Sequence, residues 1–291
     1  MNAADSIPLS GPLSDSQKAA LLTLLADEDP AVYRPIREAL ISRGPEVTTW
    51  LRRHRLSHDP LLRRRTQEII RHFERQEADD RFLAFCLNQG EELDLEAGAW
   101  LLAQTGYPDI NVAGYQALLD QFADQLGNRI QNLSQPEDLL PAINGYLFEE
   151  LGFCGNEENY YDPENSYLNR VLDRRTGNPI NLSLVYILVT RRLRLPVAGI
   201  GLPGHFICRY QTSAAEVYID PFGRGKLLSK SDCIQYLLQG NYSLREDYLA
   251  PTTPRRMLLR ICGNLHQIYD HLGHKSEVTR LQRYLVALSS R

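Results

Sequence analysis

The sequence predicts an α+β fold that is mostly helical, with one buried central helix against a small antiparallel sheet and helical repeat-like segments flanking this core. Three observations support this prediction. Apolar residues recur at steps of three and four through residues 17–103 and again through residues 255–288, as in amphipathic helices. Residues 179–195 predict a helix that is apolar on nearly all sides. Short β-branched and aromatic runs follow within residues 197–220, as in a hairpin.

The composition is typical of a soluble globular protein. The chain has 291 residues, of which 43% are hydrophobic and 23% are charged, and its net charge is −4. Its first residues lack the charged-then-apolar pattern of a secretory signal, and no apolar run approaches the roughly 20 residues that span a bilayer. The five cysteines stand singly, which argues against a disulfide framework or a structural zinc site. We therefore expect a cytoplasmic protein that does not associate with membranes.

The N-terminal region, residues 1–103, is predicted to be a helical scaffold. Short breaks that contain proline separate its apolar segments, and Asp29 and Asp59 stand where N-caps are expected before prolines. Paired helices with such turns resemble a stack of HEAT-like repeats, although the sequence has no clean period. We expect this region to serve as structure rather than to carry chemistry.

Residues 52–75 hold a local excess of eight arginines. A nucleic-acid-binding patch is one interpretation, and it makes a nucleic-acid-linked regulator an alternative function. The segment lacks the interleaved aromatic residues on which bases stack, and the whole chain is acidic. We therefore interpret it as the solvated face of a helical segment and do not expect nucleic acid as a partner.

The residues that suggest chemistry lie in a middle domain predicted over residues 104–250. Asn178 and Pro179 form a strong helix start, because asparagine caps free N–H groups and proline at the first helical position sacrifices no hydrogen bond. His205 begins a predicted strand after the helix, and Asp220 ends the next one. If Tyr210 pairs with Ala215 across a four-residue loop, His205 lies directly opposite Asp220, and the side chains of these two residues share one face.

An aspartate in that position can accept the Nδ1–H of a histidine, select its tautomer and stabilise its cation. A buried helix, a strand with histidine and a strand with aspartate form the layout of a papain-like thiol site. Where the nucleophile is expected, however, the chain reads Gly177-Asn178-Pro179. The sequence therefore has the frame of a cysteine enzyme without its cysteine.

Three short segments of this domain resemble the transglutaminase-like core of the SirB-type bacterial family. They are Gly-x-Pro-x-x-Leu-Ser at residues 177–183, Pro-Gly-His-Phe at residues 203–206 and Asp-Pro-Phe at residues 220–222. The resemblance runs from about residue 136 to the C-terminus. It implies a regulator of SirC expression, in which a transglutaminase-like core is flanked by helical and tetratricopeptide-like segments.

Active transglutaminase folds carry a cysteine at the N-terminus of the central helix, facing a histidine and an aspartate. The resemblance assigns the histidine to His205 and the aspartate to Asp220, and it places the cysteine at about Pro179. Proline cannot be a nucleophile, so the sequence favours a protein that is not an active transglutaminase or protease.

Two other side chains are alternative candidates for the nucleophile. Ser183 lies one turn beyond Pro179 on the same helix face, where a serine that bonds the Pro179 carbonyl is the simpler interpretation. Cys154 lies in the irregular loop before the helix and is the cysteine that is free to approach His205. Only His205 and Asp220 converge as possible ligands, so we predict neither a metal nor a cofactor. The full candidate site comprises His205, Asp220, Ser183 and Cys154, with Asn178, Pro179 and Asn181 as pocket residues.

The C-terminal region, residues 251–291, is predicted to be a tetratricopeptide-like helical hairpin. A single such unit cannot bury its own apolar face, so it must pack on the preceding domain or on a partner. We therefore predict a regulatory or protein-binding module whose helical segments contact a protein partner. The alternative is a divergent hydrolase or acyl-transferase that uses Cys154 or Ser183 with His205.

Overall fold

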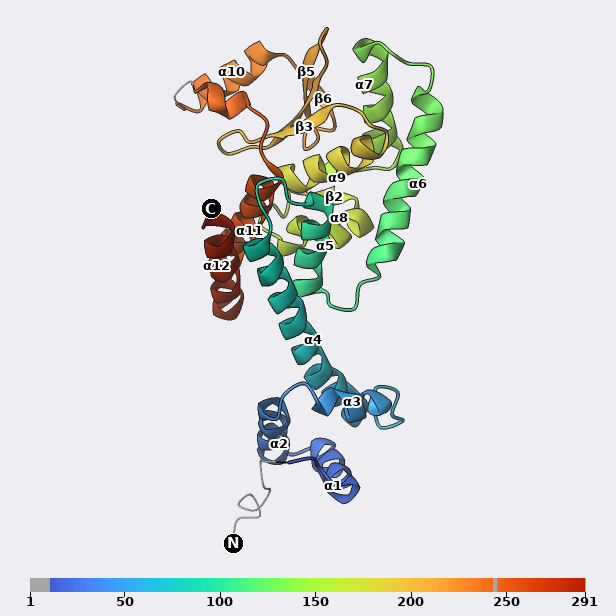
Figure 1. The fold of residues 1–291 in the computed structure, drawn as a ribbon, viewed down its shortest axis with the longest axis vertical. Helices are drawn as coiled ribbons and strands as arrows, with labels where there is room; N and C mark the ends of the chain where they lie inside the picture. The colour runs from blue at the N-terminus through green and yellow to red at the C-terminus, as the bar shows by residue number, and fades with distance from the viewer. Residues whose placement is uncertain (1–10, 243–244, 291) are drawn as a thin grey trace. The chain divides into compact units, whose positions relative to one another are not determined.

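The computed structural model of the chain describes residues 11–242 and 245–290, and the remaining residues lie outside this description. The chain forms two compact units, the first ending at Ala78 and the second starting at Asp79. Helices dominate both units, and small sheets occur in the second (Figure 1). The predicted α+β class is therefore confirmed. The division into residues 1–103, 104–250 and 251–291 stays a prediction.

The first unit is a set of helices whose starts are capped as the sequence predicts. Asp29 accepts a hydrogen bond from the Ala31 N–H at 2.8 Å, and Asp59 accepts one from the Leu61 N–H at 2.8 Å. Leucines and aromatic residues of these helices form one apolar core. The elements are α1 (Asp15–Leu25), α2 (Pro30–Ser42), α3 (Val47–Leu51), the 3₁₀ turn η1 (Arg52–His54) and α4 (Pro60–Asn88), which continues into the second unit.

Part of the arginine excess in residues 52–75 has a structural role within this unit. Arg65 is buried, donates to the Leu25 carbonyl at 2.8 Å, and lies with its guanidinium 3.8 Å from the centre of the Tyr33 ring. Arg63 donates to the carbonyl of Ser57. These two arginines therefore hold turns and helices of the unit together.

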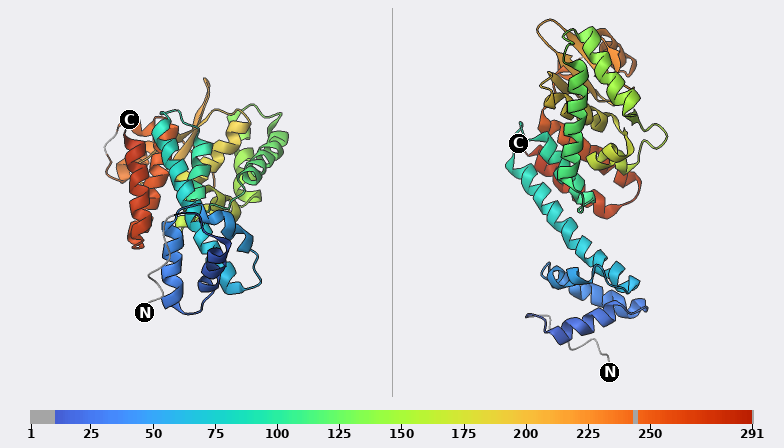
Figure 2. Two further views of the ribbon diagram at one scale, coloured as in Figure 1. Left: turned by 60° about the horizontal axis from the view of Figure 1, so that its bottom comes forward. Right: turned by 90° about the vertical axis from the view of Figure 1, so that its right-hand side faces the viewer.

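The second unit places further helices around its core. Asp94 and Asn111 cap two of them, each accepting hydrogen bonds from backbone N–H groups of the first turn. Helices α6 and α7 run next to each other along one side of this unit (Figures 1 and 2). The elements are α5 (Leu95–Gly106), α6 (Val112–Ile130), α7 (Pro136–Asn144), the π-helical turn η2 (Gly145–Glu150), η3 (Pro163–Ser166), α8 (Leu168–Arg174), α10 (Lys230–Gln239) and η4 (Glu246–Leu249).

Helix α9 (Pro179–Arg192) is the buried central helix that the sequence predicts. Every residue from Pro179 to Thr190 is buried, because the helix contacts the four-stranded sheet as well as α6, α8 and α11. Arg192, in its last turn, pairs with Glu96 at 2.8 Å and with Asp120 at 2.6 Å. The positive charge of Arg192 suits the negative end of the helix dipole.

The strands form an antiparallel sheet of four and a short parallel pair. The sheet order is β3-β4-β5-β6, so each strand pairs with its neighbour in sequence. The short pair is β1 with β2. The bounds are β1 (Cys154–Gly155), β2 (Thr176–Gly177), β3 (Val197–Ile200), β4 (Ile207–Gln211), β5 (Glu216–Asp220) and β6 (Lys226–Leu228).

The predicted pairing of Tyr210 with Ala215 is wrong. Tyr210 pairs with Val217, and the hairpin loop is residues 212–215. The difference in register is caused by Thr212. Its hydroxyl accepts hydrogen bonds from the N–H groups of Ala214 and Ala215, so the turn closes one residue later than predicted. Asp220 consequently lies diagonally across from His205, which stands two residues before β4, rather than directly opposite it.

The C-terminal hairpin consists of α11 (Pro254–His271) and α12 (Lys275–Ser289). Helix α11 packs against α5, α9 and η3, so the hairpin shares the core of the second unit. Arg255, which is 1% exposed, donates to carbonyls at the C-terminal ends of two helices. The acceptors are Cys86 and Gln89 at the end of α4 and Ala287 and Leu288 at the end of α12.

Within residues 11–242 and 245–290, none of the helices is both long enough and apolar enough to cross a membrane.

Candidate functional site

The structure brings His205 and Asp220 together. His205 follows the turn at Gly204 and precedes β4, and its Nε2 lies 3.0 Å from Oδ2 of Asp220 at the end of β5. The sequence predicted a bond through Nδ1, and that detail is wrong. With the observed register the histidine must reach diagonally, and Nε2 is the ring nitrogen farther from the backbone. The other carboxylate oxygen of Asp220 accepts the N–H groups of Phe222 and Gly223, so the turn holds the carboxylate in place.

Aromatic rings surround this pair. The Phe222 ring lies edge-on to His205 with 6.2 Å between ring centres, and the Tyr236 ring lies at 6.1 Å. The Tyr236 hydroxyl donates to the carbonyl of Pro203 and ties α10 to the turn before the histidine. The side chains of His205 and Asp220 are each 18% exposed. The pair is thus mostly enclosed. The turn after β5 orients Asp220, and the two aromatic rings flank His205.

The start of α9 is held by a network of buried amides. Oδ1 of Asn178 accepts both the backbone N–H and the side-chain amide of Asn181, each at 3.0 Å. The Asn178 amide donates to the Ser166 hydroxyl at 2.9 Å. Pro179 follows as the first helical residue. Proline at this position is compatible with the helix because no hydrogen bond is lost, but it brings no reactive atom.

A loop with two tyrosines lies beside this helix start. Asn165, which is fully buried, donates through its side-chain amide to the carbonyls of Asn159 and Tyr160, and its own carbonyl accepts the Asn178 N–H at 3.3 Å. Tyr160 and Tyr161 are therefore carried by an ordered loop that is tied to α9. Burial raises the pKa of Tyr160.

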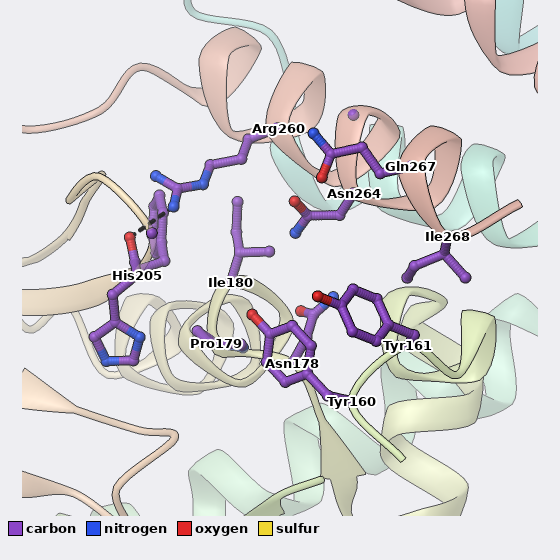
Figure 3. Close-up of a pocket in the computed structure, with 13 residues that line it drawn as sticks. Tyr160, Tyr161, Asn178, Pro179, Ile180, His205, Arg260, Asn264, Gln267 and Ile268 are labelled. Carbon is purple, nitrogen blue, oxygen red and sulfur yellow. Dashed lines mark hydrogen bonds between the residues drawn. The ribbon is translucent and has the colours of Figure 1, made fainter. Parts of the chain in front are cut away.

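Between this loop, the start of α9 and α11 lies a cavity of about 490 Å³ (Figure 3). Two of the three predicted pocket residues, Asn178 and Pro179, line it together with His205, whereas Asn181 does not. The lining residues are Tyr160, Tyr161, Asn178, Pro179, Ile180, Gly204, His205, Phe206, Arg260, Gly263, Asn264, Gln267 and Ile268.

Ser183 lies in the core rather than in the cavity. It is 0% exposed, and its hydroxyl donates to the carbonyl of Phe206 at 3.4 Å. The predicted bond to the Pro179 carbonyl is therefore wrong, because the residue before β4 offers a carbonyl to the helix. Cys208, also fully buried, donates to the Ser183 carbonyl, and burial raises the pKa of this thiol.

Cys154 lies on β1 and faces a different cavity. It lines a space of about 660 Å³ together with Phe222 and Arg224, and His205 is not part of that lining. The Phe222 ring packs tightly against Gly155. In the described parts of the chain, no hydrogen bond links either Cys154 or Ser183 to His205.

Helix α11 contributes residues to the cavity that the sequence prediction missed. Arg260 donates through Nη2 to the His205 carbonyl at 2.7 Å, and its guanidinium lies 5.4 Å from the centre of the Phe206 ring. Burial lowers the pKa of Arg260. Asn264 and Gln267 follow at helical spacing. This spacing was visible in the sequence, but only the packing of α11 beside α9 shows which residues it faces.

The described residues contain no cluster of three or more histidine, cysteine, aspartate or glutamate side chains that could hold a metal ion.

Known proteins resemble this chain over much of its length. A family model for the transglutaminase-like superfamily matches residues 113–263. A UPF0162 protein of Xylella fastidiosa is 36% identical over 197 residues, which cover 65% of this chain and 70% of the relative. A UPF0162 protein of Vibrio cholerae is 31% identical over 208 residues, covering 71% of this chain and 74% of the relative.

A third relative matches the chain over a much smaller share of its own length. F-box only protein 21 of Mus musculus is 36% identical over 144 residues, which cover 47% of this chain and 22% of that protein. No solved structure matches the chain. The family match extends over just over half of the residues and includes the start of α9, His205 and Asp220. The chain therefore belongs to the transglutaminase-like superfamily.

Proposed function

We propose that this protein is a non-catalytic transglutaminase-like module that acts by binding a partner protein and has a regulatory role. One observation carries the proposal: Pro179 occupies the first position of α9 and lines the cavity that also contains His205. A cysteine at this position would benefit from the helix dipole, which favours the thiolate. Proline offers neither a thiol nor a hydroxyl, and it lacks an N–H group.

The remaining parts of the frame support a binding role. The hydrogen bond between His205 and Asp220 orients the histidine, and the bond from Arg260 to the His205 carbonyl attaches the same turn to α11. These contacts form the walls of a cavity without supplying a nucleophile.

The finer assignments belong to the same proposal. We assign the chain to the SirB-type proteins, with a tetratricopeptide-like hairpin at residues 251–291 and a cytoplasmic location. The helical segments on either side of the core would present the surface for the partner protein. The likeness to a small part of F-box only protein 21 supports a core that works as a module within proteins of different architecture.

A turnover assay tests the proposal. The purified full-length chain is incubated with casein and a fluorescent primary amine, and separately with fluorogenic peptide amides and esters. We expect no product above the background of a His205→Ala variant, because no thiol or hydroxyl of the described residues forms a hydrogen bond with the imidazole. Turnover that is present in the wild type and lost in His205→Ala would show that the protein is an enzyme and would overturn the proposal.

A further inference from the structure

Three polar residues of α11 form one wall of the cavity beside Pro179. Arg260, Asn264 and Gln267 are spaced at i, i+4 and i+7, so they share one face of the helix. All three line the cavity. Figure 3 shows them across from Ile180 and the two loop tyrosines. We call these three residues the α11 polar row.

Arg260 carries a positive charge that has no counter-ion in the described structure. Its one protein hydrogen bond there is the bond from Nη2 to the His205 carbonyl, and it takes part in no ion pair. Two arginines of α12 do have counter-ions: Arg280 pairs with Glu277, and Arg283 pairs with Asp79. Arg260 thus places an unpaired charge in the cavity wall.

The surroundings of Arg260 favour an incoming anion. Burial of its guanidinium lowers its pKa, which means that the cation has lost hydration without a compensating charge. An anion in the cavity would compensate the guanidinium for the hydration that it has lost. The bond to the His205 carbonyl and the packing over Phe206 fix the guanidinium before a ligand arrives, so little side-chain entropy is lost on binding.

The chemistry of a guanidinium selects carboxylates among common protein groups. Its planar fork of N–H donors matches the two oxygens of a carboxylate, and such charge-assisted bonds are about twice as strong as neutral ones. The N-terminal end of α9, at Ile180, also faces the cavity and adds a positive potential. The side-chain amides of Asn264 and Gln267 can both donate and accept, as binding to peptide groups requires.

The mouth of the cavity is suited to a protein chain. Tyr160 is 41% exposed and Tyr161 is 62% exposed, and both line the cavity. Tyrosine is enriched at protein interfaces because it buries a large area at low entropy cost. A volume of about 490 Å³ accommodates a few residues of an extended peptide.

We propose that the cavity binds a carboxylate of an extended segment of the partner protein. Arg260 receives the carboxylate, Asn264 and Gln267 bond to adjacent peptide groups, and the loop tyrosines cover the segment. The carboxylate belongs either to an acidic side chain or to a chain terminus. This inference rests on the proposed binding function and names the chemical class of the partner.

Binding of peptide pools to the full-length protein tests the inference. The probes are fluorescein-labelled heptapeptides whose flanking positions are randomised without aspartate or glutamate. One pool has a central glutamate and an amidated end, one a central glutamine and an amidated end, and one a central glutamine and a free C-terminal carboxylate. Fluorescence anisotropy measures the affinities. We expect at least one carboxylate pool to bind about tenfold more tightly than the amidated glutamine pool. The pool that does so identifies the source of the carboxylate.

Two variants and one control connect the preference to the cavity. Arg260→Met should remove the preference for carboxylates, whereas Arg256→Met, at an exposed position one turn earlier on α11, should retain it. Gly263→Leu should abolish binding of all pools without unfolding the protein. Gly263 lines the cavity, and a Cβ atom there would have no neighbour within 4 Å, so the new side chain fills the cavity rather than clashing with the fold. Circular dichroism melting curves check the fold of each variant.

The outcomes separate this inference from the proposed function. Equal affinity for all pools, no binding of any pool, or a carboxylate preference that survives in Arg260→Met would overturn the carboxylate site and leave the absence of catalysis intact. If Arg260→Met does not fold, continued binding by folded Gly263→Leu would overturn the site. Mass spectrometry of the recovered peptides provides the other check: cleavage or deamidation that requires His205 would overturn the non-catalytic function.

Discussion

Pro179 is the residue on which the proposed absence of thiol chemistry depends. It begins α9 and lines the same cavity as His205, which is already bonded to Asp220. Every other part of a thiol site is therefore near the position that proline occupies. This allows the role of the single residue to be tested by restoring a cysteine.

Replacing Pro179 with cysteine should create a reactive thiol. The helix dipole and the nearby histidine favour the thiolate, so alkylation by iodoacetamide at pH 7 should be on the order of fivefold faster than at an exposed cysteine. The matched control is Arg256→Cys, at an exposed position of α11. Mass spectrometry of the two alkylated peptides gives the rates. Equal rates would mean that the frame around His205 does not activate a thiol.

The Asn178 side chain should contribute strongly to stability. It caps α9 and also bonds to Ser166, and it is 4% exposed. Asn178→Ala should lower the free energy of unfolding by about 2 to 3 kcal/mol, through the lost cap and an unsatisfied partner. Asn111→Ala removes an exposed cap of α6 and should cost only about 0.5 to 1 kcal/mol. Urea denaturation of both variants measures the difference, and similar losses would contradict the prediction.

At the scale of elements, Arg255 joins the ends of two helices to the start of a third. Its guanidinium satisfies carbonyls at the C-terminal ends of α4 and α12, where helices leave acceptors without intrahelical partners. A charge is tolerated in this buried position because the surrounding carbonyls and the negative ends of both helix dipoles stabilise it.

Arg255→Met should therefore destabilise the protein by at least about 3 kcal/mol, since several buried carbonyls lose their donor at once. The adjacent Arg256 is exposed, and Arg256→Met should change the free energy of unfolding by less than about 0.5 kcal/mol. Urea denaturation distinguishes the two. A small effect at Arg255 would mean that water replaces the guanidinium at these carbonyls.

Helix α11 also contains a glycine that has no packing role. A Cβ atom at Gly263 would meet nothing within 4 Å. Gly263→Ala should raise the free energy of unfolding by about 0.5 to 1 kcal/mol, because alanine loses less backbone entropy in a helix. Thermal melting monitored by circular dichroism measures the change. A lower melting temperature would indicate that the cavity wall depends on a bare backbone there.

At the scale of the whole molecule, charge argues against nucleic acid as a partner. The net charge is −4, and within the basic segment Arg65 is buried against Tyr33. We expect no measurable binding of a labelled single-stranded oligonucleotide at physiological salt. Binding that weakens steeply as salt rises would contradict this expectation, because it would reveal a phosphate contact surface.

Much of the fold could be predicted because it depends on local patterns. The caps at Asp29, Asp59 and Asn178, and the burial of α9, follow from residue type and apolar spacing, and the structure confirms them. The predicted pairing register of β4 with β5 was wrong, because Tyr210 pairs with Val217 rather than with Ala215. The Thr212 hydroxyl decides where the turn closes. The alternation of apolar and polar residues along the strands does not reveal which side chain will form hydrogen bonds in the turn.

The sequence by itself determined that a buried helix begins at Pro179 and that an aspartate ends a strand after it, since these are features of neighbouring residues. It placed His205 at the start of a strand, whereas the strand begins at Ile207. Only the tertiary structure decided that Ser183 is enclosed in the core, that Cys154 faces another cavity, and that Arg260 enters the wall of the cavity beside His205. The physical reason is that helix packing brings α11 against α9 from far along the chain, and no local pattern specifies which faces meet.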